Sequence, residues 1–287
     1  VLEAKTPLAI GSGNKEIHTD ATVAKDVNGL PYIPGTSIAG VVRHALGLVE
    51  KEDTFWGFQS NRKDDKGNNI GCGSEIIFSE AKMIGTESKA IDGLQTLKGD
   101  FYEAFKSLPV RQHVRITDKG VGADHGKFDE EIVFKGTRFV FDIEAVSQTD
   151  DTTQFKNVLN QLRSAEFRIG AGSRKGFGKM EVVSCRYQIL DLSKAEDLQQ
   201  YLDYTSSLAD DFKGIEYNDN SSQNDGIVKY ELELKPDDFM LFGAGFGDED
   251  VDLVPVKEKV VDYAQKKVVD ANILIPASSI KGALAHR

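Results

Sequence analysis

The sequence predicts an α+β fold. Three observations support this class. Short stretches with strand character alternate with two segments whose apolar residues recur at helical spacing. Glycine-rich or polar turns separate these stretches. A segment near residue 34 recurs near residue 276, which indicates that one α+β unit begins twice.

The composition is that of a globular protein with room for two domains. The chain has 287 residues, of which 40% are hydrophobic and 28% charged. No apolar run approaches the roughly 20 residues that span a bilayer, and the first residues lack signal-peptide character. Cys72 and Cys185 are far apart and form no CxxC, which favours free thiols in a reducing cytoplasm. We expect a cytoplasmic protein without a membrane anchor or structural zinc.

The acidic charge is concentrated in one segment. Of the net charge of −11, the stretch from Asp191 to Asp225 carries −7, from nine acidic and two basic residues. An acidic protein is a poor nucleic-acid binder, but this objection weakens outside that stretch. We predict a first domain at residues 1–190, an acidic linker at 191–225 and part of a second domain at 226–287.

The first elements are a strand and a helix. Residues 2–10 are predicted to form a strand, followed by Gly11-Ser12-Gly13 and a polar loop. Pro34-Gly35 makes a turn, and Thr36 or Ser37 is expected to cap the helix. The apolar face of this helix comprises Ile38, Val41, Val42, Ala45, Leu46 and Val49. Gly40 would cost about 1 kcal/mol in a helix interior, so we expect something to approach its backbone closely.

The remaining elements complete the unit. We expect a strand in residues 73–84, two strands around a long polar loop in 110–146, and a helix over 153–167. A glycine loop then enters a last strand near 180–183. This order is that of a ferredoxin-like domain. After the linker, alternating Val228, Tyr230, Leu232 and Leu234 predict that the strand pattern restarts.

The internal repeat has a constant spacing. Pro34 matches Pro276, Gly40 matches Gly282 and His44 matches His286, each 242 residues apart. Ser37 and Ile38 likewise match Ser279 and Ile280. The second copy reaches only the start of its helix, so we expect a longer natural protein.

Six motifs in this order resemble the RAMP superfamily of CRISPR-associated proteins, and most closely the tandem backbone subunits of type III effector complexes. The resemblance covers residues 1–185 and about 228–287. The motifs are LAIGSG, LPYIPGTSIAGVVR, TFWGF, GSEIIFSEA, HVRIT with GVGADHGKFDEEIVFKGTRFVFDI, and GAGSRKGFGKMEV. It implies a ferredoxin-like or RRM-like domain with a hairpin "thumb", followed by the start of a second such domain. It also implies crRNA, complementary target RNA and other effector subunits as partners.

The resemblance assigns catalysis to loop aspartates. Asp20 occupies the place where the family carries an aspartate that cleaves target RNA, and Asp252 matches it in the second copy, with Asp250 as the alternative. Such a carboxylate holds Mg²⁺ or another divalent cation, or orients the neighbouring 2′-hydroxyl. We therefore expect Asp20 and Asp252 to be both catalytic residues and metal ligands.

RNA-binding residues are expected in three places. The glycine loop is basic and flexible enough to approach phosphates, and the helix N-terminus offers N–H groups to them. The hairpin, with Val121 and Phe128 as apolar tip candidates, would wedge into the RNA duplex. The expected residues are Gly170, Gly172, Arg174, Lys175 and Gly176 in the loop; Ser37, Arg43, His44 and Lys281 on the two helices; and Arg111 and Arg115 on the hairpin.

Two alternatives stay open. The superfamily also includes metal-independent endonucleases that process precursor crRNA with a histidine base, for which His18, His44, His113 and His125 are candidates. The other alternative is a backbone subunit that binds RNA without cleaving it. An enzyme acting on other substrates is disfavoured, because the sequence has no nucleotide fingerprint and no Ser/His/Asp motif, and we expect no small-molecule cofactor.

Overall fold

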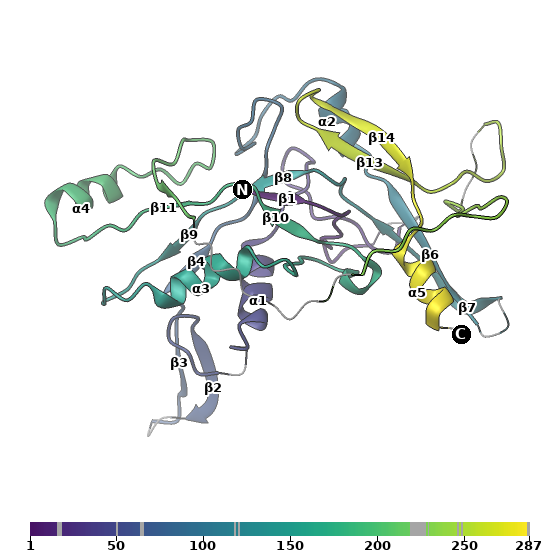
Figure 1. The fold of residues 1–287 in the computed structure, drawn as a ribbon. Coiled ribbons are helices and arrows are strands. Elements are labelled where there is room, and N and C mark those ends of the chain that lie inside the picture. Colours follow the sequence, from purple (N-terminus) through teal and green to yellow (C-terminus); the bar gives the residue numbers. More distant parts are fainter. Residues whose placement is uncertain are drawn as a thin grey trace.

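Four short strands form the central antiparallel sheet of the computed structural model (Figure 1). The structure describes residues 1–15, 19–49, 51–63, 66–117, 119, 121–218, 228, 230–245, 247 and 249–285. The strand order is β10–β1–β8–β5, and every neighbouring pair is antiparallel. The strands are β1 (Leu2–Ala4), β5 (Lys82–Met83), β8 (Arg138–Val140) and β10 (Met180–Val182). When these four strands are numbered 1 to 4 along the chain, their order across the sheet is 4–1–3–2, which is the ferredoxin-like order. The α+β prediction is confirmed.

Strand β1 is shorter than the predicted strand at residues 2–10. Leu2 and Ala4 are buried, while Glu3 lies between them and binds Arg138 on β8 at 2.8 Å. Pairing lapses before Pro7, which has no N–H to donate. It resumes as single bridges from Leu8 and Ala9 to other segments.

Two helices lie together on one side of this sheet (Figure 1). They are α1 (Gly35–Ala45) and α3 (Thr153–Leu162). Ile38 and Val42 of α1 are fully buried, as the helical spacing predicted. The predicted cap is wrong, because Pro34 occupies the N-cap position and its carbonyl receives the N–H groups of Ser37 and Ile38.

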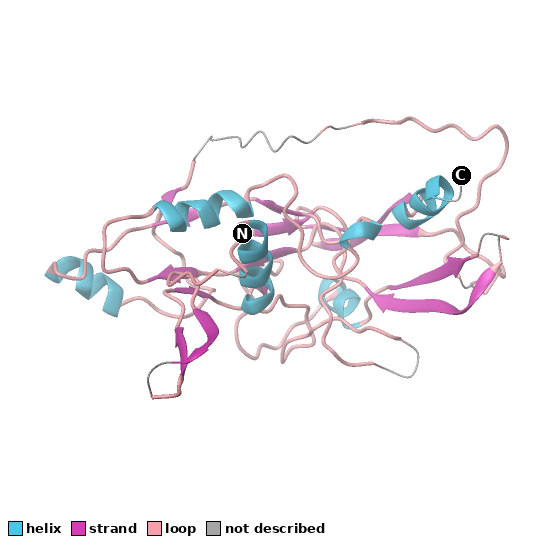
Figure 2. Cartoon of the chain, turned by 90° about the horizontal axis from the view of Figure 1, so that it is seen from below, coloured by secondary structure: helices cyan, strands magenta, loops and turns pink. Residues whose placement is uncertain are grey.

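Several further elements are insertions into this unit. The single strand predicted at residues 73–84 is two strands, one paired with β9 and one in the central sheet. Figure 2 shows two hairpins, β2–β3 and β6–β7, that extend away from the sheet. The inserted elements are β2 (Phe58–Lys63), β3 (Asn69–Cys72), β4 (Ile76–Phe78), α2 (Asp100–Lys106), β6 (Val110–Ile116), β7 (Gly122–Glu131), β9 (Ile143–Ala145) and η1 (Ser173–Lys175).

The predicted hairpin arm exists, but its second strand was placed wrongly. The polar stretch expected to be a loop is β7 itself, and it pairs with β6 from Val110↔Glu131 to Ile116↔Gly122. The outer part of the hairpin is exposed to solvent, with Val114 and Ile116 more than half exposed. Alternating apolar residues indicate a strand with one buried face. Because the outer part of β7 has no buried face, its sequence does not show this alternation.

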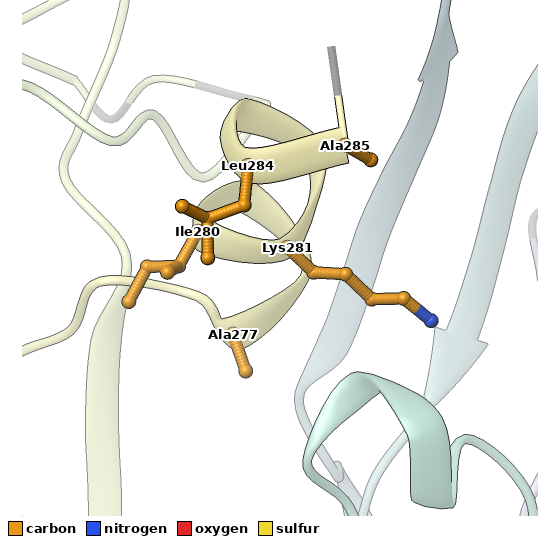
Figure 3. A pocket seen from close by; sticks show the side chains of 5 residues that line it. All are labelled: Ala277, Ile280, Lys281, Leu284 and Ala285. Atoms are coloured by element: carbon orange, nitrogen blue, oxygen red, sulfur yellow. The ribbon is translucent and has the colours of Figure 1, made fainter. Parts of the chain in front are cut away.

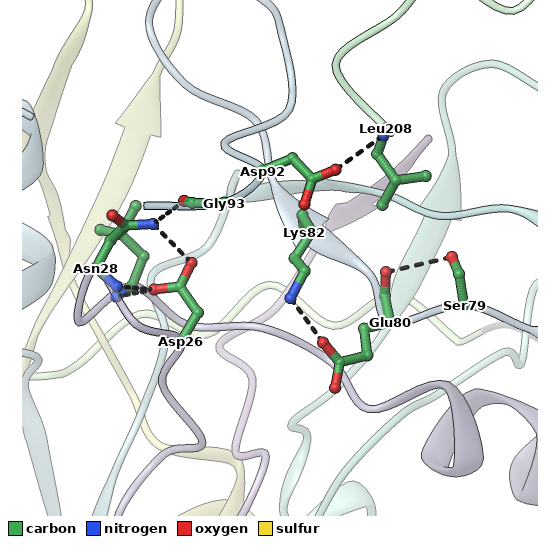
Figure 4. A network of polar contacts seen from close by, with 9 residues as sticks. Asp26, Asn28, Ser79, Glu80, Lys82, Asp92, Gly93 and Leu208 are labelled. Atoms are coloured by element: carbon green, nitrogen blue, oxygen red, sulfur yellow. Dashed lines mark hydrogen bonds and ion pairs between the residues drawn. The ribbon is translucent and has the colours of Figure 1, made fainter. Parts of the chain in front are cut away.

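The described part of the expected acidic linker contacts the rest of the chain. It contains α4 (Ala195–Leu202) and β12 (Ile215–Glu216), which pairs with β11 (Arg186–Tyr187). Tyr217 is buried, and its hydroxyl donates to Asn160 of α3 at 2.8 Å. The Leu208 N–H donates to Asp92 (Figure 4). The domain boundaries themselves stay a prediction.

The internal repeat is visible as repeated backbone hydrogen bonds. Two backbone bonds within residues 10–24 have counterparts 232 positions later in the sequence. The two pairs are Ser12→Thr22 with Ala244→Val254, and Ala24→Ile10 with Val256→Phe242, all between 2.8 and 2.9 Å. The bridge Gly11↔Val23 likewise matches Gly243↔Pro255. The sequence repeat therefore describes a repeated backbone shape.

The two copies differ in the length of one turn. In the first copy Lys25 pairs with Pro31, and the Asp26 carboxylate receives the N–H groups of Asn28 and Leu30 to form the tight turn in Figure 4. In the second copy Lys257 pairs with Ile273, so ten more residues separate the partners. They form the hairpin β13 (Lys257–Asp262) and β14 (Lys267–Ile273), which precedes α5 (Ala277–Ala285).

This longer hairpin fastens the second copy to the first. Val261 is buried and donates its N–H to the carbonyl of Lys135. The Tyr263 hydroxyl accepts the N–H of Arg138 on the central sheet and donates to the carbonyl of Ile84, both at 3.0 Å. Three hydrogen bonds and a buried valine thus attach this hairpin to the first copy.

The strand predicted from Val228 to Leu234 is absent from the described residues of that stretch. Val228, Tyr230, Leu232 and Leu234 are all at least 65% exposed, and Figure 2 shows the stretch as a long loop. A strand exists only by pairing, and no described strand lies alongside to receive its hydrogen bonds. Among the helices in the described residues, none is long and apolar enough to cross a membrane.

Candidate nucleic-acid interface

The loop that carries Asp20 is fastened along strand β7. Asp20 accepts the backbone N–H of Asp129 through Oδ2 at 3.0 Å and donates its own N–H to the Asp129 carbonyl. Further along, Glu131 accepts the N–H of Val23 at 2.8 Å and binds Lys25 at 2.7 Å. The predicted catalytic carboxylate is therefore exposed but held in a fixed place.

Asp129 brings a second carboxylate to this place, and the sequence reasoning missed it. Its Oδ1 atom is buried with no hydrogen-bond partner among the described residues, while Lys127 lies 3.5 Å from Oδ2. Mg²⁺ commonly takes one or two protein carboxylates and fills its other positions with water and phosphate. Asp20 and Asp129 are the two residues here that would hold such an ion. No group of three or more His, Cys, Asp or Glu side chains suited to a metal occurs in the described part of the chain.

Asp252 lies in the loop equivalent to that of Asp20. The loop is closed by the repeated bonds of residues 242–256, and Asp252 is exposed within it. The backbone of Gly247 passes close to the Val251 and Asp252 carbonyls. The second loop thus repeats the hydrogen bonds that close the first, and its Gly245 lies against the side chain of Gln112 on β6.

The glycine loop is shaped by contacts within the chain. Gly178 has φ +76°, and a methyl group there would lie 2.1 Å from the Ile169 carbonyl oxygen. Gly170 similarly faces the Ala9 carbonyl, Gly172 the Phe177 ring, and Gly176 the Ala277 methyl at the start of α5. Folding alone therefore requires these glycines.

The two neighbouring bases of this loop have different surroundings. Arg174 is exposed, whereas the Lys175 ammonium lies 3.1 Å from Glu130 on β7 and 5.1 Å from the centre of the Phe128 ring. Nζ of Lys175 is thus turned back onto the hairpin, and Arg174 is the base that the loop presents to solvent.

Glu130 is the centre of a buried charge cluster that the sequence did not indicate. Its side chain is only 4% exposed, and its Oε1 lies 2.6 Å from Nε2 of His113 and 3.1 Å from Nζ of Lys175. The His113 N–H is not well aligned with this line, so that contact is electrostatic rather than a good hydrogen bond. Burial raises the pKa of Glu130, but His113 and Lys175 outweigh it and hold the pKa below its ordinary value. Buried Arg111 lies in the field of Glu130 and of Glu258.

Among the candidate RNA-binding residues of α1, Arg43 is bound to backbone carbonyls of this chain, whereas His44 and Ser37 differ from it. The Arg43 guanidinium donates to the carbonyls of Leu48, Trp56 and Gly57, with the shortest contact at 2.9 Å. It therefore holds the segment after α1. His44 is exposed, and Ser37 is half-buried in the first turn.

Gly40 does not have the close neighbour that we expected. A methyl group at Gly40 would meet no atom of the described residues within 4 Å, and the same holds for its counterpart Gly282. On α5, Lys281 is exposed at the rim of a hollow lined by Ala277, Ile280, Leu284 and Ala285 (Figure 3).

The candidate RNA-binding residues of the hairpin lie at different distances from its tip. Val121 closes the turn, where its carbonyl accepts the N–H of Thr117, and it is 59% exposed. Phe128 is not at the tip, because it pairs with His113 and lies beneath Lys175. Arg115 is exposed on β6.

The histidine candidates do not converge. His113 is engaged with Glu130, His44 is on α1, and His125 is exposed on β7. His18 lies outside the described residues. Cys72 is exposed and Cys185 half-buried, and both are free thiols.

Residues 1–181 match the family model described as the RAMP superfamily. The chain belongs to the RAMP superfamily. The match ends close to β10, so it spans the whole ferredoxin-like unit and leaves the second copy outside.

Similar solved structures were also found. A chain of "Type III-B Cmr-beta Cryo-EM structure of the Apo state" is 16% identical, with a TM-score of 0.45 over 63% of this chain and 94% of that chain. A chain of "Type IV-B CRISPR Complex" is 16% identical, with a TM-score of 0.43 over 71% of this chain and 97% of that chain. No curated protein matches.

Proposed function

We propose that this RAMP protein binds crRNA as a backbone subunit of a type III CRISPR effector complex. The observation that carries this proposal is the convergence of two loops on strand β7 of the hairpin. The Asp20 loop, the glycine loop and the hairpin, which the motifs single out separately, meet at Asp129, Glu130 and Glu131. Arg174 and Arg115 are exposed bases of this region, and they would contact phosphates.

The two open helical glycines support an external partner. Gly40 and Gly282 occupy equivalent places, and neither is explained by a neighbour among the residues that the structure describes. A glycine at such a place lets another backbone approach the helix. We infer that RNA backbone or a neighbouring subunit occupies this space.

We propose further that Asp20 cleaves the paired target RNA. A divalent cation held by Asp20 and Asp129 would stabilise charge on the phosphate. The neighbouring 2′-oxygen attacks phosphorus, the bond to the 5′-oxygen breaks, and that oxygen takes a proton from water, so the products are a 2′,3′-cyclic phosphate and a 5′-hydroxyl. Asp20 would receive the 2′-hydroxyl proton directly or through water.

Asp252 is the second proposed cleavage residue. The repeated bonds around residues 242–256 support its equivalence to Asp20. Residues 228–285 are then the start of a second RAMP unit, attached to the first by β13–β14.

RNA binding is tested with the 287-residue chain and a single-stranded RNA of about 40 nucleotides. Affinity is measured from 50 to 400 mM salt, and phosphate contacts require a steep fall of affinity with salt. Arg174→Gln plus Arg115→Gln is the test variant, and Lys194→Gln in α4's N-terminal region is the control. Equal, salt-independent binding by all three proteins would refute the proposal.

Cleavage is tested in the assembled complex with target RNA and Mg²⁺. Asp20→Asn and Asp252→Asn should each remove cuts, while EDTA removes all of them. Unchanged cuts in both variants would leave a subunit that only binds RNA. Cleavage of free repeat RNA in EDTA, abolished by His44→Ala, would instead favour the precursor-processing enzyme.

A further inference from the structure

The glycine loop and the hairpin are separate in sequence but joined by one carboxylate. Oε1 of Glu130 receives both the Lys175 ammonium, from the loop, and the His113 ring, from the facing strand β6. The carboxylate is almost fully buried, with 4% of its side chain exposed. A buried charge of this kind depends strongly on its partners, because an uncompensated one is costly.

Apolar contacts reinforce the same junction. The Phe128 ring lies below the Lys175 ammonium at 5.1 Å, and the ring of Phe177 meets that of His113 edge-on at 6.0 Å. Phe177 is itself buried against Ala9 and Ile132. The loop therefore has no freedom to turn Lys175 outward without breaking the charge pair and the ring contact together.

We propose that Glu130 is a positioning residue that fixes the glycine loop to the base of the hairpin through Lys175 and His113. Lys175 then attaches the loop, and Arg174 alone of this basic pair contacts RNA phosphate. The first statement concerns the free protein, whereas the second rests on the proposed function. Sequence reasoning had assigned both bases to RNA.

The attachment is tested without RNA by native-state trypsin cleavage after Arg174. Glu130→Gln retains the shape of the side chain and removes its charge, and Lys175→Met retains most of the stem. Each variant should speed cleavage at Arg174 by about tenfold, the effect of losing a hydrogen bond to a charged group. The double variant should be no faster than either single one. Rates equal to that of the wild type, or rates that multiply in the double variant, would overturn the proposal.

Matched controls keep this test interpretable. Lys127→Met removes an exposed ammonium from the same hairpin and should leave cleavage at Arg174 unchanged. Circular dichroism spectra identical to that of the wild type identify variants that fold. If Glu130→Gln fails to fold, Lys175→Met and His113→Gln still measure the two arms of the junction.

The division of labour is tested by the salt dependence of binding to the same RNA of about 40 nucleotides. Arg174→Gln should lower the slope of log affinity against log salt by about one phosphate contact. Lys175→Met should weaken binding while leaving the slope unchanged. An equal loss of slope in Lys175→Met would overturn the proposal. If no protein binds RNA, the proposed function fails, while the trypsin result still decides the attachment.

Discussion

Asp20 accepts the backbone N–H of Asp129 at 3.0 Å, so the proposed cleavage residue is fixed to the strand that also carries the hairpin. The bond uses a main-chain donor, and it therefore does not depend on the side chain of Asp129. A substitution at Asp20 that retains an oxygen acceptor should preserve the loop and remove only the charge.

We accordingly expect Asp20→Asn to fold normally and to lose cleavage. The change in unfolding free energy should stay within about 0.5 kcal/mol, while cleavage at its sites falls by about 100-fold or more. Urea unfolding and a target-RNA cleavage assay measure the two effects. Asp124→Asn alters an almost fully exposed acid on the hairpin and should change neither. Full activity in Asp20→Asn would exclude its carboxylate from the reaction.

Substitution of Gly40, which has open space beside it, should have opposite effects on stability and on binding. Gly40→Ala should stabilise the protein by about 0.5–1 kcal/mol, since alanine is the better helix former and nothing within 4 Å obstructs its methyl group. Under the proposed function it should also weaken RNA binding or complex assembly. Gly73→Ala, also unobstructed, is the control for binding. A more stable variant with unaltered binding and assembly would show that no partner uses this space.

Tyr263 tests the fastening of the second copy. Tyr263→Phe leaves the Arg138 N–H and the Ile84 carbonyl without their partner, which should reduce stability by about 1–3 kcal/mol. Chymotrypsin should then cut the 228–285 region faster. Tyr230→Phe, at a side chain 84% exposed, should change stability by less than about 0.5 kcal/mol. Equal proteolysis of both variants would mean that β13–β14 is held elsewhere.

Glu3 should contribute a pH-dependent part of the stability. Burial raises its pKa, but Arg138 and Lys5 outweigh burial and hold the pKa below the ordinary 4.5. A lowered pKa stabilises the folded state above the unfolded value and loses this effect as pH falls through the folded value. Glu3→Gln should therefore melt lower than the wild type at pH 7, and the two melting temperatures should approach each other near pH 3. A constant difference between pH 7 and 3 would contradict this assignment.

The two thiols should react at different rates. Cys72 is exposed, whereas burial raises the pKa of the Cys185 thiol. Less thiolate and less access both slow alkylation, so iodoacetamide at pH 8 should label Cys72 first by mass spectrometry. Cys185→Ser should leave the fast phase intact, and Cys72→Ser should remove it.

Sequence patterns predicted the elements that bury one face. The helical spacing of Ile38 and Val42 was sufficient to find α1, because both side chains enter the core. The same reasoning failed for β7, whose outer part faces solvent, and for Val228–Leu234, which has apolar alternation but no strand beside it among the described residues. Alternating apolar residues show that a segment could form a strand with one buried face. Whether the strand forms depends on a partner strand elsewhere in the chain.

The candidate site was predictable only in its separate pieces. Asp20 and the glycine loop were found from their motifs, but Asp129 and Glu130 sit in an ordinary acidic run. Their roles arise because Asp129 meets Asp20 from 109 residues away and Glu130 meets Lys175 from 45 residues away. Arg43 and Lys175 were both basic enough to suggest RNA, and only their carbonyl and carboxylate partners distinguish them from Arg174.

The ten additional residues of β13–β14 also suggest how the second unit could be detached from the first by protein engineering. The backbone pattern on either side of them already exists in a short form, with Lys25 paired to Pro31 across a tight turn. Replacing the long hairpin by that turn would release the unit that carries Asp252 and leave both aspartate loops unaltered. The first copy thus supplies a short natural form of this connection. With it, versions of one protein can be made in which the second unit is either attached to the first or free.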